Sequence, residues 1–351
     1  MRILLATDAW KPQVNGVVTT YEWLAREVPA LGSQLVMLTP ADYASMPCPT
    51  YPEIALALPR PRQTARLIAA AAPDAIHIAT EGPVGWSVRR WCLANRVPFT
   101  TSFHTRFPEY IRARFAVPET YTYALLRRFH NAGSGMMVAS PSLGADLKSR
   151  GFDRILPWTR GVDLSLFRPR AVRMFGDGPV LIYVGRVAIE KSIEDFLDLD
   201  VPGRKVVVGD GPQRAELMRR YPDVLFTGHK SGQELAEAYA SADVFVFPSR
   251  TDTFGIVLIE AMASGVPVAA YPVTGPVDIV TPGVSGALDR DLKSAVLAAL
   301  QLPRGPVEAA AARFTWGHAA RMFVDNVGRV VRAAKLRSAP GRAVFPWPRS
   351  A

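Results

Sequence analysis

The residues best suited to chemistry lie in one run of the chain, residues 248–267, PSRTDTFGIVLIEAMASGVP. The apolar run VFVFP before it predicts a buried strand that ends at a proline and a polar turn. After Gly255 the apolar spacing becomes that of a helix packed on most sides. A helix that begins at the carboxyl end of a strand presents unpaired N–H groups and its positive dipole end, which bind anions such as phosphate.

Two acids flank this predicted anion site. Asp252 precedes the helix, and Glu260 lies roughly 7 Å along it, at ~1.5 Å per residue, with its side chain leaning back toward the start. A carboxylate there can accept two hydrogen bonds from a diol beside a phosphate, and Asp252 could bind hydroxyls of a second group. The predicted ligand is therefore a nucleotide sugar. The alternative stays open that Asp252 caps the helix and Glu260 is a solvated surface acid. The backbone predicted to line the anion site is that of Thr253, Phe254, Gly255 and Ile256.

Two motifs in the first half of the chain also follow predicted strands. The turn at Asn15 and Gly16 lets backbone approach a ligand before a helix begins. In TSFHTRF, His104 lies at a strand end between threonines. A single histidine is structural as often as catalytic, so both roles remain open for His104.

Two further motifs follow strands in the second half. In VGRVAIEKS, Arg186 and Lys191 would neutralise a departing diphosphate. In VVVGDGPQRAEL, Gly209 and Gly211 flank a strand-to-helix turn that either shapes a nucleotide pocket or is a simple turn. The acidic triplet at residues 198–200 precedes Pro202 at the wrong end of the sheet, so we expect no metal site there.

Composition sets the class of protein. The chain has 351 residues, enough for two domains, and its 49% hydrophobic and 21% charged residues are typical of a globular protein. Cys48 and Cys92 show no pairing or metal spacing, which favours a reduced compartment. The start MRILLATDAW resembles a first strand and not a signal peptide, and no run of 18 apolar residues exists to span a membrane.

The net charge of +10 is unevenly distributed. Lys and Arg outnumber Asp and Glu by 18 to 12 in residues 1–165 and by 8 to 2 in residues 307–351, whereas residues 166–306 have 15 against 17. Arginines flanked by aromatic residues, in FPEYIRARF and YALLRRFH, predict a basic amphipathic surface that can rest on an anionic membrane. No nucleic-acid recognition motif occurs, and we expect no nucleic-acid partner.

Predicted strands and helices alternate along the chain, which indicates an α/β protein with two doubly wound parallel sheets. The carboxyl ends of both sheets are expected to face a shared cleft. The irregular segment 159–179 marks the boundary between domains, predicted at 1–165 and 166–306. One long helix at about 308–335, within a segment 307–337, and a loose tail at 338–351 complete the expected chain.

The order of the motifs NGV, FHT, GVDxxxF, GRxxxEK, VGDGP and DTFGIVLIEAMASG resembles the retaining enzymes of glycosyltransferase family 4 (GT4). The resemblance implies the GT-B fold: two Rossmann-like domains facing a central cleft, with the last helix crossing back to the first domain. It also implies that Glu260 holds the ribose, Arg186 and Lys191 hold the diphosphate, and His104 lies near the anomeric carbon. The family has an E-x7-E pair, in which Asp252 stands here at the first position.

Three segments, IATEGPVGWSVRRWC, TSFHTRFPEYIRARF and PSRTDTFG, are similar to a bacterial branch that glycosylates lipids. This resemblance implies transfer of a hexose or hexuronic acid, from UDP-glucose or UDP-glucuronic acid, to diacylglycerol, without metal, cofactor or obligate protein partner. The implied location is cytoplasmic, peripheral on the inner face of the cytoplasmic membrane. A GDP-mannose-dependent mannosyltransferase is the alternative. An epimerase or phosphorylase of the same fold, and a catalytically silent binding protein, are further hypotheses; the presence of both His104 and Lys191 argues against the last.

Overall fold

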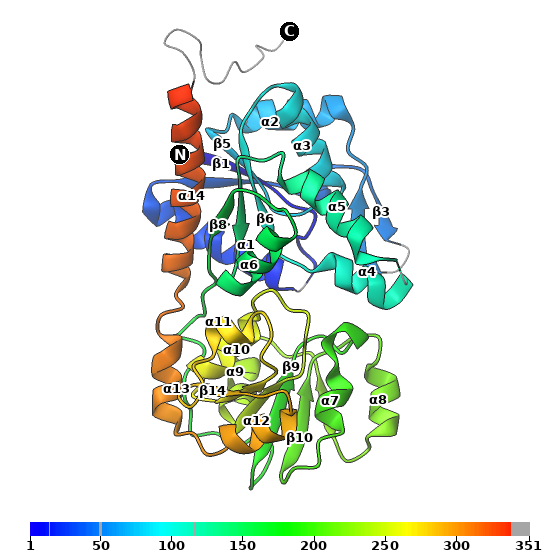
Figure 1. The fold of residues 1–351 in the computed structure, drawn as a ribbon, viewed down its shortest axis with the longest axis vertical. Coiled ribbons are helices and arrows are strands. Elements are labelled where there is room, and N and C mark those ends of the chain that lie inside the picture. The colour runs from blue at the N-terminus through cyan, green and yellow to red at the C-terminus, as the bar shows by residue number, and fades with distance from the viewer. Residues whose placement is uncertain (14, 49–50, 116, 338–351) are drawn as a thin grey trace. The chain divides into compact units, whose positions relative to one another are not determined.

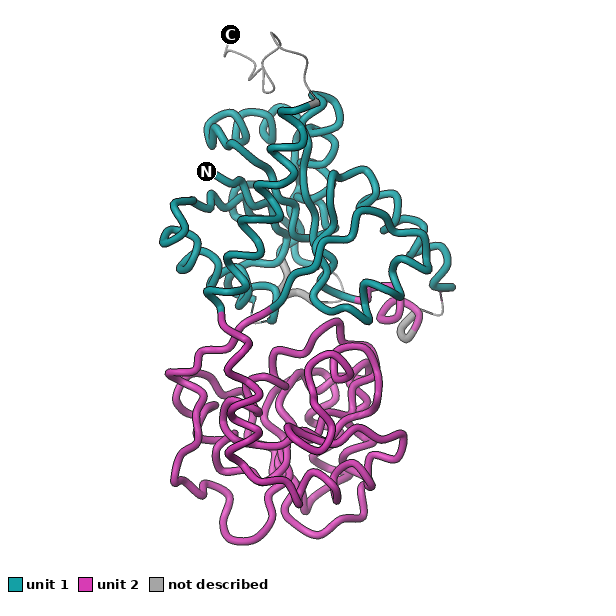
Figure 2. Tube along the Cα trace, turned by 60° about the vertical axis from the view of Figure 1, so that its left-hand side comes forward, with its two compact units in different colours: residues 1–105, 118–159, 316–351 teal, residues 106–117, 160–315 magenta. Residues whose placement is uncertain are grey.

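The computed structural model of the chain describes residues 1–13, 15–48, 51–115 and 117–337. The chain forms two compact units (Figure 2): unit 1 comprises Met1–Thr105, Pro118–Thr159 and Trp316–Ala351, and unit 2 comprises Arg106–Val117 and Arg160–Thr315. The chain therefore passes between units within segment 159–179, the predicted boundary region. A short piece from the first half of the sequence, Arg106–Val117, belongs to unit 2.

Unit 1 is built on a six-stranded sheet in which every pair of neighbouring strands is parallel (Figure 1). Its strands, in spatial order, are β2 (Gln34–Leu38), β1 (Arg2–Ala6), β5 (Ala75–Ile78), β6 (Phe99–Phe103), β7 (Gly135–Val138) and β8 (Ile155–Pro157). The central strands β5, β6 and β7 are buried along their whole length because helices cover both faces of the sheet.

The alternation of side chains along β1 shows the two covered faces of unit 1. Leu4 and Ala6 pack with residues of helices α2 (Pro61–Ala71), α3 (Pro83–Ala94) and α5 (Glu119–His130). Ile3 and Leu5 point the other way, to α1 (Gly16–Glu27) and α14 (Trp316–Arg337). Helix α6 (Pro141–Ser149) joins α5 over β7. Beside this sandwich lie the antiparallel hairpin of β3 (Ser45–Cys48) and β4 (Tyr51–Ala57), and the 3₁₀ turns η1 (Val28–Leu31) and η2 (Pro40–Asp42).

Unit 2 repeats the plan with a second parallel six-stranded sheet. Its spatial order is β11 (Leu225–Gly228), β10 (Arg204–Val208), β9 (Val180–Val184), β12 (Val244–Phe247), β13 (Val268–Ala270) and β14 (Gly286–Leu288). One face packs on α7 (Ile193–Leu197), α8 (Arg214–Arg220) and α12 (Leu292–Ala299). The other elements are α4 (Phe107–Phe115), η3 (Ile189–Lys191), α9 (Gly232–Ala240), α10 (Ile256–Ala263), α11 (Pro276–Ile279) and α13 (Arg304–Ala311).

The predicted class, two doubly wound parallel sheets, is confirmed, and each strand inferred from an apolar run is present. The single helix expected at 308–335 is wrong, since α13 ends at Ala311 and α14 starts at Trp316. The helix is interrupted because Phe314 turns into unit 2, where its ring packs on Phe254 and its carbonyl accepts a hydrogen bond from the Val162 amide. The predicted tail, 338–351, lies outside the described residues.

Helix α14, the last described element, belongs to unit 1, although unit 2 precedes it in the sequence. Trp316 stacks on Trp23 of α1, with ring centroids 5.8 Å apart. Trp158 Nε1 donates to the Ala319 carbonyl at 2.9 Å, and Asn326 Nδ2 donates to the Pro157 carbonyl at 2.9 Å. Within the described part of the chain, no helix is both long enough and apolar enough to cross a membrane.

Candidate active site

The loop after β9 carries Arg186 and Lys191, and glycines hold this loop against its neighbour. Gly209 has φ of +144°, and a Cβ there would lie 1.9 Å from the Gly185 carbonyl oxygen. A Cβ on Gly211 would lie 2.3 Å from the Val187 carbonyl oxygen. The glycines of VGDGP are therefore required by the close packing of two loops at the carboxyl edge of the sheet.

Lys191 and Asp252, which are 61 positions apart in sequence, form an ion pair in unit 2. The Lys191 ammonium donates to both carboxylate oxygens of Asp252, at 2.7 and 2.9 Å. Each side chain is 18% exposed. Burial lowers the pKa of Lys191, but the Asp252 carboxylate and two nearby phenols outweigh burial and raise this pKa, so Lys191 remains charged. Arg186, by contrast, is exposed.

Tyr110 on α4 is a third member of this cluster that the sequence did not reveal. Its phenol lies close to the charged Lys191, and burial raises the pKa of this phenol. Arg106, at the start of the same segment, is 8% exposed; it binds Glu109 at 2.9 Å and the Thr274 hydroxyl at 3.2 Å. The expectation of a basic surface formed by the arginines between Arg106 and Arg128 is therefore wrong at Arg106, which immediately precedes FPEYIRARF and is buried within unit 2.

Helix α10 begins as the sequence predicts, after a left-handed glycine. Gly255 is the N-cap with φ of +93°, and no side chain caps the helix. The alternative role of Asp252 as a helix cap is therefore wrong. Phe254 is buried, and Thr253 precedes it in the loop. The first amides of an α-helix, here those of Ile256 and its neighbours, have no partner within the helix and can receive an anion.

Glu260 lies on α10 and is not a solvated surface acid. Its side chain is partly buried, and Oε2 accepts a hydrogen bond from the hydroxyl of Tyr239 on α9 at 3.0 Å. Burial raises the pKa of Glu260 to about 7, although the bond from Tyr239 opposes this shift. The Tyr239 ring is fully buried and packs on Phe245, with centroids 5.8 Å apart. The carboxylate is thus held in one place and titrates near neutral pH.

The candidate residues of unit 1 are connected through α1. Asn15 caps this helix, and its side chain accepts the amides of Val17 and Val18, both at 3.0 Å. Gly16 is the first helical residue. One turn and a half later, the hydroxyl of Tyr21 lies 2.8 Å from Nε2 of His104, which follows β6 and is partly buried. Helix α1 therefore connects the two predicted residues of unit 1: it begins at Gly16, and its Tyr21 contacts His104.

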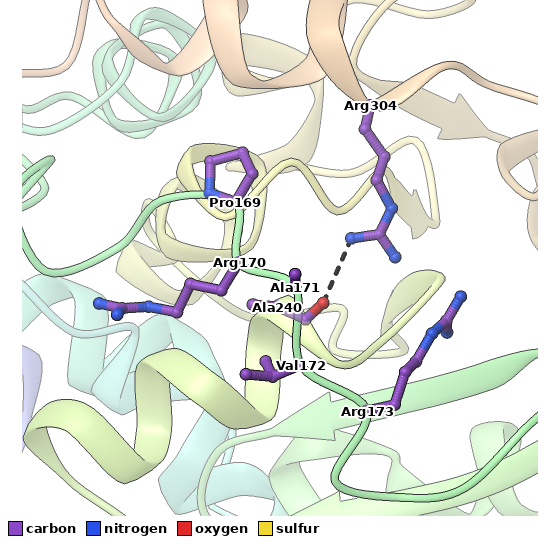
Figure 3. A pocket seen from close by; sticks show the side chains of 7 residues that line it. All are labelled: Pro169, Arg170, Ala171, Val172, Arg173, Ala240 and Arg304. Carbon is purple, nitrogen blue, oxygen red and sulfur yellow. Dashed lines mark hydrogen bonds between the residues drawn. The ribbon is translucent and has the colours of Figure 1, made fainter.

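A groove of about 610 Å³ on unit 2 lies among residues that the sequence did not associate with chemistry (Figure 3). Two of its arginines connect separate segments of unit 2. Arg304 donates to the Ala240 carbonyl at 3.3 Å. Both Arg173 and Arg304 form ion pairs with the Asp243 carboxylate. These contacts fasten the segment that follows the domain boundary. The residues that line the groove are Pro169, Arg170, Ala171, Val172, Arg173, Ala240 and Arg304.

The structure thus groups the predicted site residues in two sets. Unit 2 holds the diphosphate candidates, both acids and the start of α10, and unit 1 holds Gly16 and His104. Sequence reasoning missed four polar side chains that contact these residues directly or, for His77, through Tyr21. One signal was visible: a histidine lies in the apolar run AIHIA. The four side chains are Tyr21, His77, Tyr110 and Tyr239.

Two doubly wound parallel units in this order define a protein of the GT-B class, and the similarity of the chain to known proteins narrows that class. The family model described as Glycosyltransferase Family 4 matches residues 14–166, and the model described as Glycosyl transferases group 1 matches residues 178–302. A GDP-mannose-dependent alpha-mannosyltransferase of Mycobacterium tuberculosis is 32% identical over 317 residues, which cover 82% of this chain and 83% of that protein. The chain belongs to glycosyltransferase family 4, as its motifs predict.

Other similar proteins differ in what their names state. The sulfoquinovosyl transferase of Arabidopsis thaliana is 33% identical over 75% of this chain, which spans about half, 54%, of that protein. The alpha-monoglucosyldiacylglycerol synthase of Streptococcus pneumoniae is 26% identical over 86% of this chain and 78% of that protein. Among solved structures, sucrose-phosphate synthase from Thermosynechococcus elongatus has a TM-score of 0.75 and 22% identity, covering 96% of this chain and all of that one. This last likeness concerns the fold alone.

Proposed function

We propose that the protein is a retaining glycosyltransferase that moves a hexose or hexuronic acid from UDP-glucose or UDP-glucuronic acid to diacylglycerol in a membrane. The observation that carries the proposal is the partly buried ion pair of Lys191 and Asp252 in the unit whose helix α10 holds Glu260. Family membership makes the protein a glycosyltransferase. The relative whose name states a diacylglycerol product supports the lipid acceptor.

On the donor side, Glu260 would accept hydrogen bonds from the ribose hydroxyls, since a carboxylate can accept two from a diol. Lys191 and Arg186 would bind the diphosphate, together with the amides at the start of α10. Without a donor, Lys191 and Asp252 satisfy one another. With a donor bound, the phosphate oxygens would share Lys191, and the Asp252 carboxylate would become available for a sugar hydroxyl.

In the proposed reaction, the bond between the anomeric carbon and the diphosphate oxygen breaks as the acceptor hydroxyl attacks from the same face of the sugar. The electron pair of the broken bond goes to the leaving diphosphate, and the acceptor proton goes to the oxygen that leaves. Lys191, Arg186 and the α10 amides stabilise the charge that develops on this oxygen. His104 would position the sugar or share the positive charge of the oxocarbenium-like centre.

On the acceptor side, helix α5 of unit 1 supports binding to an anionic membrane. Tyr121 and Leu125 are four residues apart, hence on one side of the helix, and are 72% and 53% exposed. Arg127 and Arg128 follow at its carboxyl end and are also exposed. An apolar ridge with basic neighbours is the pattern of a helix that rests in the interface of a bilayer. The proposed location is peripheral, on the inner face of the cytoplasmic membrane, and the proposal includes neither nucleic acid nor an obligate protein partner.

A second candidate is a GDP-mannose-dependent alpha-mannosyltransferase that acts on a lipid or polysaccharide. The specific observation in its favour is the relative with that name, which aligns with 82% of this chain. The two candidates share the diphosphate and ribose contacts and differ in the nucleobase and in the sugar.

A panel experiment separates these candidates. The full chain is incubated with UDP-glucose, UDP-glucuronic acid or GDP-mannose and with vesicles of diacylglycerol and anionic phospholipid, and the lipid extract is analysed by mass spectrometry. The proposal predicts a diacylglycerol product heavier by one hexose or hexuronic acid residue, formed from a UDP-sugar and carrying the α-anomeric proton coupling in NMR. A product from GDP-mannose alone would establish the second candidate, and a β-linked product would refute retention.

A further inference from the structure

A chain of buried polar side chains runs through the core of unit 1 to His104. Tyr21 of α1 places its hydroxyl 2.8 Å from Nε2 of His104 and 3.1 Å from Nε2 of His77 on β5. His77 is held at its other nitrogen by the Thr100 hydroxyl at 2.8 Å, while the Ser102 hydroxyl lies 3.0 Å from Nε2. Tyr21 and His77 are both completely buried. Each of these hydrogen bonds matters for stability, because a buried polar group that loses its partner is costly.

The positions of these protons are linked because a phenol has a single proton. Tyr21 can donate to one imidazole only, so it must accept from the other imidazole if both hydrogen bonds are made. If Tyr21 donates to His104, then Nε2 of His77 carries the proton that Tyr21 accepts. If Nε2 of His104 carries a proton, Tyr21 accepts from it and donates to Nε2 of His77, which then carries its own proton on Nδ1 and donates to the Thr100 hydroxyl. Each arrangement keeps the bond between Tyr21 and His104.

Aromatic packing keeps these groups in place. The Trp158 ring lies against both Tyr21 and His104, with centroids 6.1 and 5.9 Å away. Phe323 of α14 meets the His77 ring edge to face at 4.9 Å. Because this packing already restricts the rotation of the rings, the side chains lose little further rotational entropy when the substrate binds.

We propose that Tyr21, backed by His77, is a positioning residue that fixes the ring of His104 and lets Nε2 of His104 exchange its donor and acceptor roles without losing a partner. The inference rests on the proposed function, which places His104 beside the sugar. In that function, the imidazole would be ready to accept a hydrogen bond from a sugar hydroxyl or to share charge, and Tyr21 would compensate for the change at Nε2.

The test combines Tyr21→Phe with a matched control, Tyr43→Phe. Tyr43 is also a buried tyrosine of unit 1, and its hydroxyl contacts only the Thr64 hydroxyl, at 3.1 Å, among the hydrogen bonds described for it. The chain has five histidines, so the imidazole ¹⁵N signals of labelled full-length protein can be assigned with one substitution each. These signals show which ring nitrogen carries the proton.

We expect Tyr21→Phe to shift the ¹⁵N signals of both His77 and His104 and to lower kcat about 10- to 100-fold, the size of one lost hydrogen bond to a reacting group, with donor KM nearly unchanged. Tyr43→Phe should leave the signals and kcat as in the parent. Unchanged His104 signals in a folded Tyr21→Phe protein would overturn the inference, as would equal losses of kcat in the two variants. If the signals shift as expected but the parent makes no glycolipid, the proposed function fails and the coupling of the two histidines stands.

Discussion

Glu260 offers a quantitative test of the donor site, since its carboxyl group titrates where experiments are easily done. Burial raises its pKa to about 7, and only the carboxylate form accepts two hydrogen bonds from the ribose. Donor affinity should therefore weaken as the pH falls through 7. A nucleotide sugar is the right ligand, because its diphosphate is a diester with no proton that titrates in this range.

The magnitude follows from the fraction of protein in the carboxylate form, since the apparent Kd is the intrinsic Kd divided by that fraction. For a pKa of about 7 the apparent Kd is about 2-fold weaker at pH 7, about 11-fold weaker at pH 6 and about 100-fold weaker at pH 5 than in the fully ionised protein. Isothermal titration calorimetry of the full chain with UDP-glucose between pH 5.5 and 8.5 measures this slope directly.

Glu260→Gln is the matched control because glutamine keeps the shape and one acceptor but does not titrate. This variant should bind the donor weakly and with equal affinity across the pH range. A parent protein whose affinity is flat from pH 5.5 to 8.5 would refute the reasoning, as would a Gln variant that keeps the slope.

The raised pKa of Glu260 affects the free energy of unfolding in the opposite direction from donor binding: higher pH strengthens binding but lowers stability. A carboxyl whose folded pKa lies above its unfolded value of about 4.5 holds its proton more tightly in the folded state, so its contribution to stability is lost as pH rises from about 4.5 to about 7. At pH 8, Glu260→Gln should therefore raise the free energy of unfolding, by at most about 3 kcal/mol for a shift of about 2.5 units. Urea unfolding of both proteins at pH 5 and pH 8 checks the sign.

Three further outcomes are expected. Lys191→Met should reduce sugar transfer by about 10²- to 10³-fold. It should also lower the free energy of unfolding by about 1–3 kcal/mol, because it leaves Asp252 unpaired. The double variant with Asp252→Asn should regain stability in urea unfolding but should not regain product formation. Gly209→Ala should destabilise the protein by about 2–4 kcal/mol in thermal unfolding, since its Cβ would lie 1.9 Å from a carbonyl oxygen; a cost below about 0.5 kcal/mol would contradict the packing of the two loops. Leu125→Glu on α5 should weaken sedimentation with anionic vesicles by about tenfold, whereas Leu297→Glu on α12, which also replaces an exposed leucine, should not; equal effects would argue against α5 as the membrane surface.

Much of the fold could be predicted because parallel strands covered on both faces leave a strong apolar signal. The hairpin β3–β4 escaped prediction since Pro47 and Pro52 argue against strands, and such residues are accepted only at edges. Strand β14 starts at Gly286 and lies between Ser285 and Asp289, so no apolar run indicates it in the sequence. The break between α13 and α14 depends on where Phe314 packs, which the helical pattern of the sequence does not contain.

The site could be predicted where a motif is local and not where it is assembled from distant segments. Residues 248–267 contain the strand end, the glycine and Glu260 in one run, so the turn at Gly255 and the helix that carries Glu260 followed from spacing. The pair of Lys191 with Asp252 spans 61 positions and needs the fold. The role of Tyr110 could not be predicted, because the aromatic and basic pattern around it is also typical of a membrane surface. Only the packing of the folded chain assigns that segment to unit 2.

We propose that this glycosyltransferase moves a sugar from a nucleotide sugar to a lipid and depends on Lys191 for the transfer. The most direct measurement is the partition of label from UDP-[¹⁴C]glucose or UDP-[¹⁴C]glucuronic acid into the organic phase, with diacylglycerol vesicles and either the parent protein or Lys191→Met. We predict that the parent protein forms lipid-soluble label and that the amount formed by Lys191→Met is lower by about 10²-fold or more. Label that stays in water as intact donor or free sugar, or equal transfer by both proteins, would contradict the account.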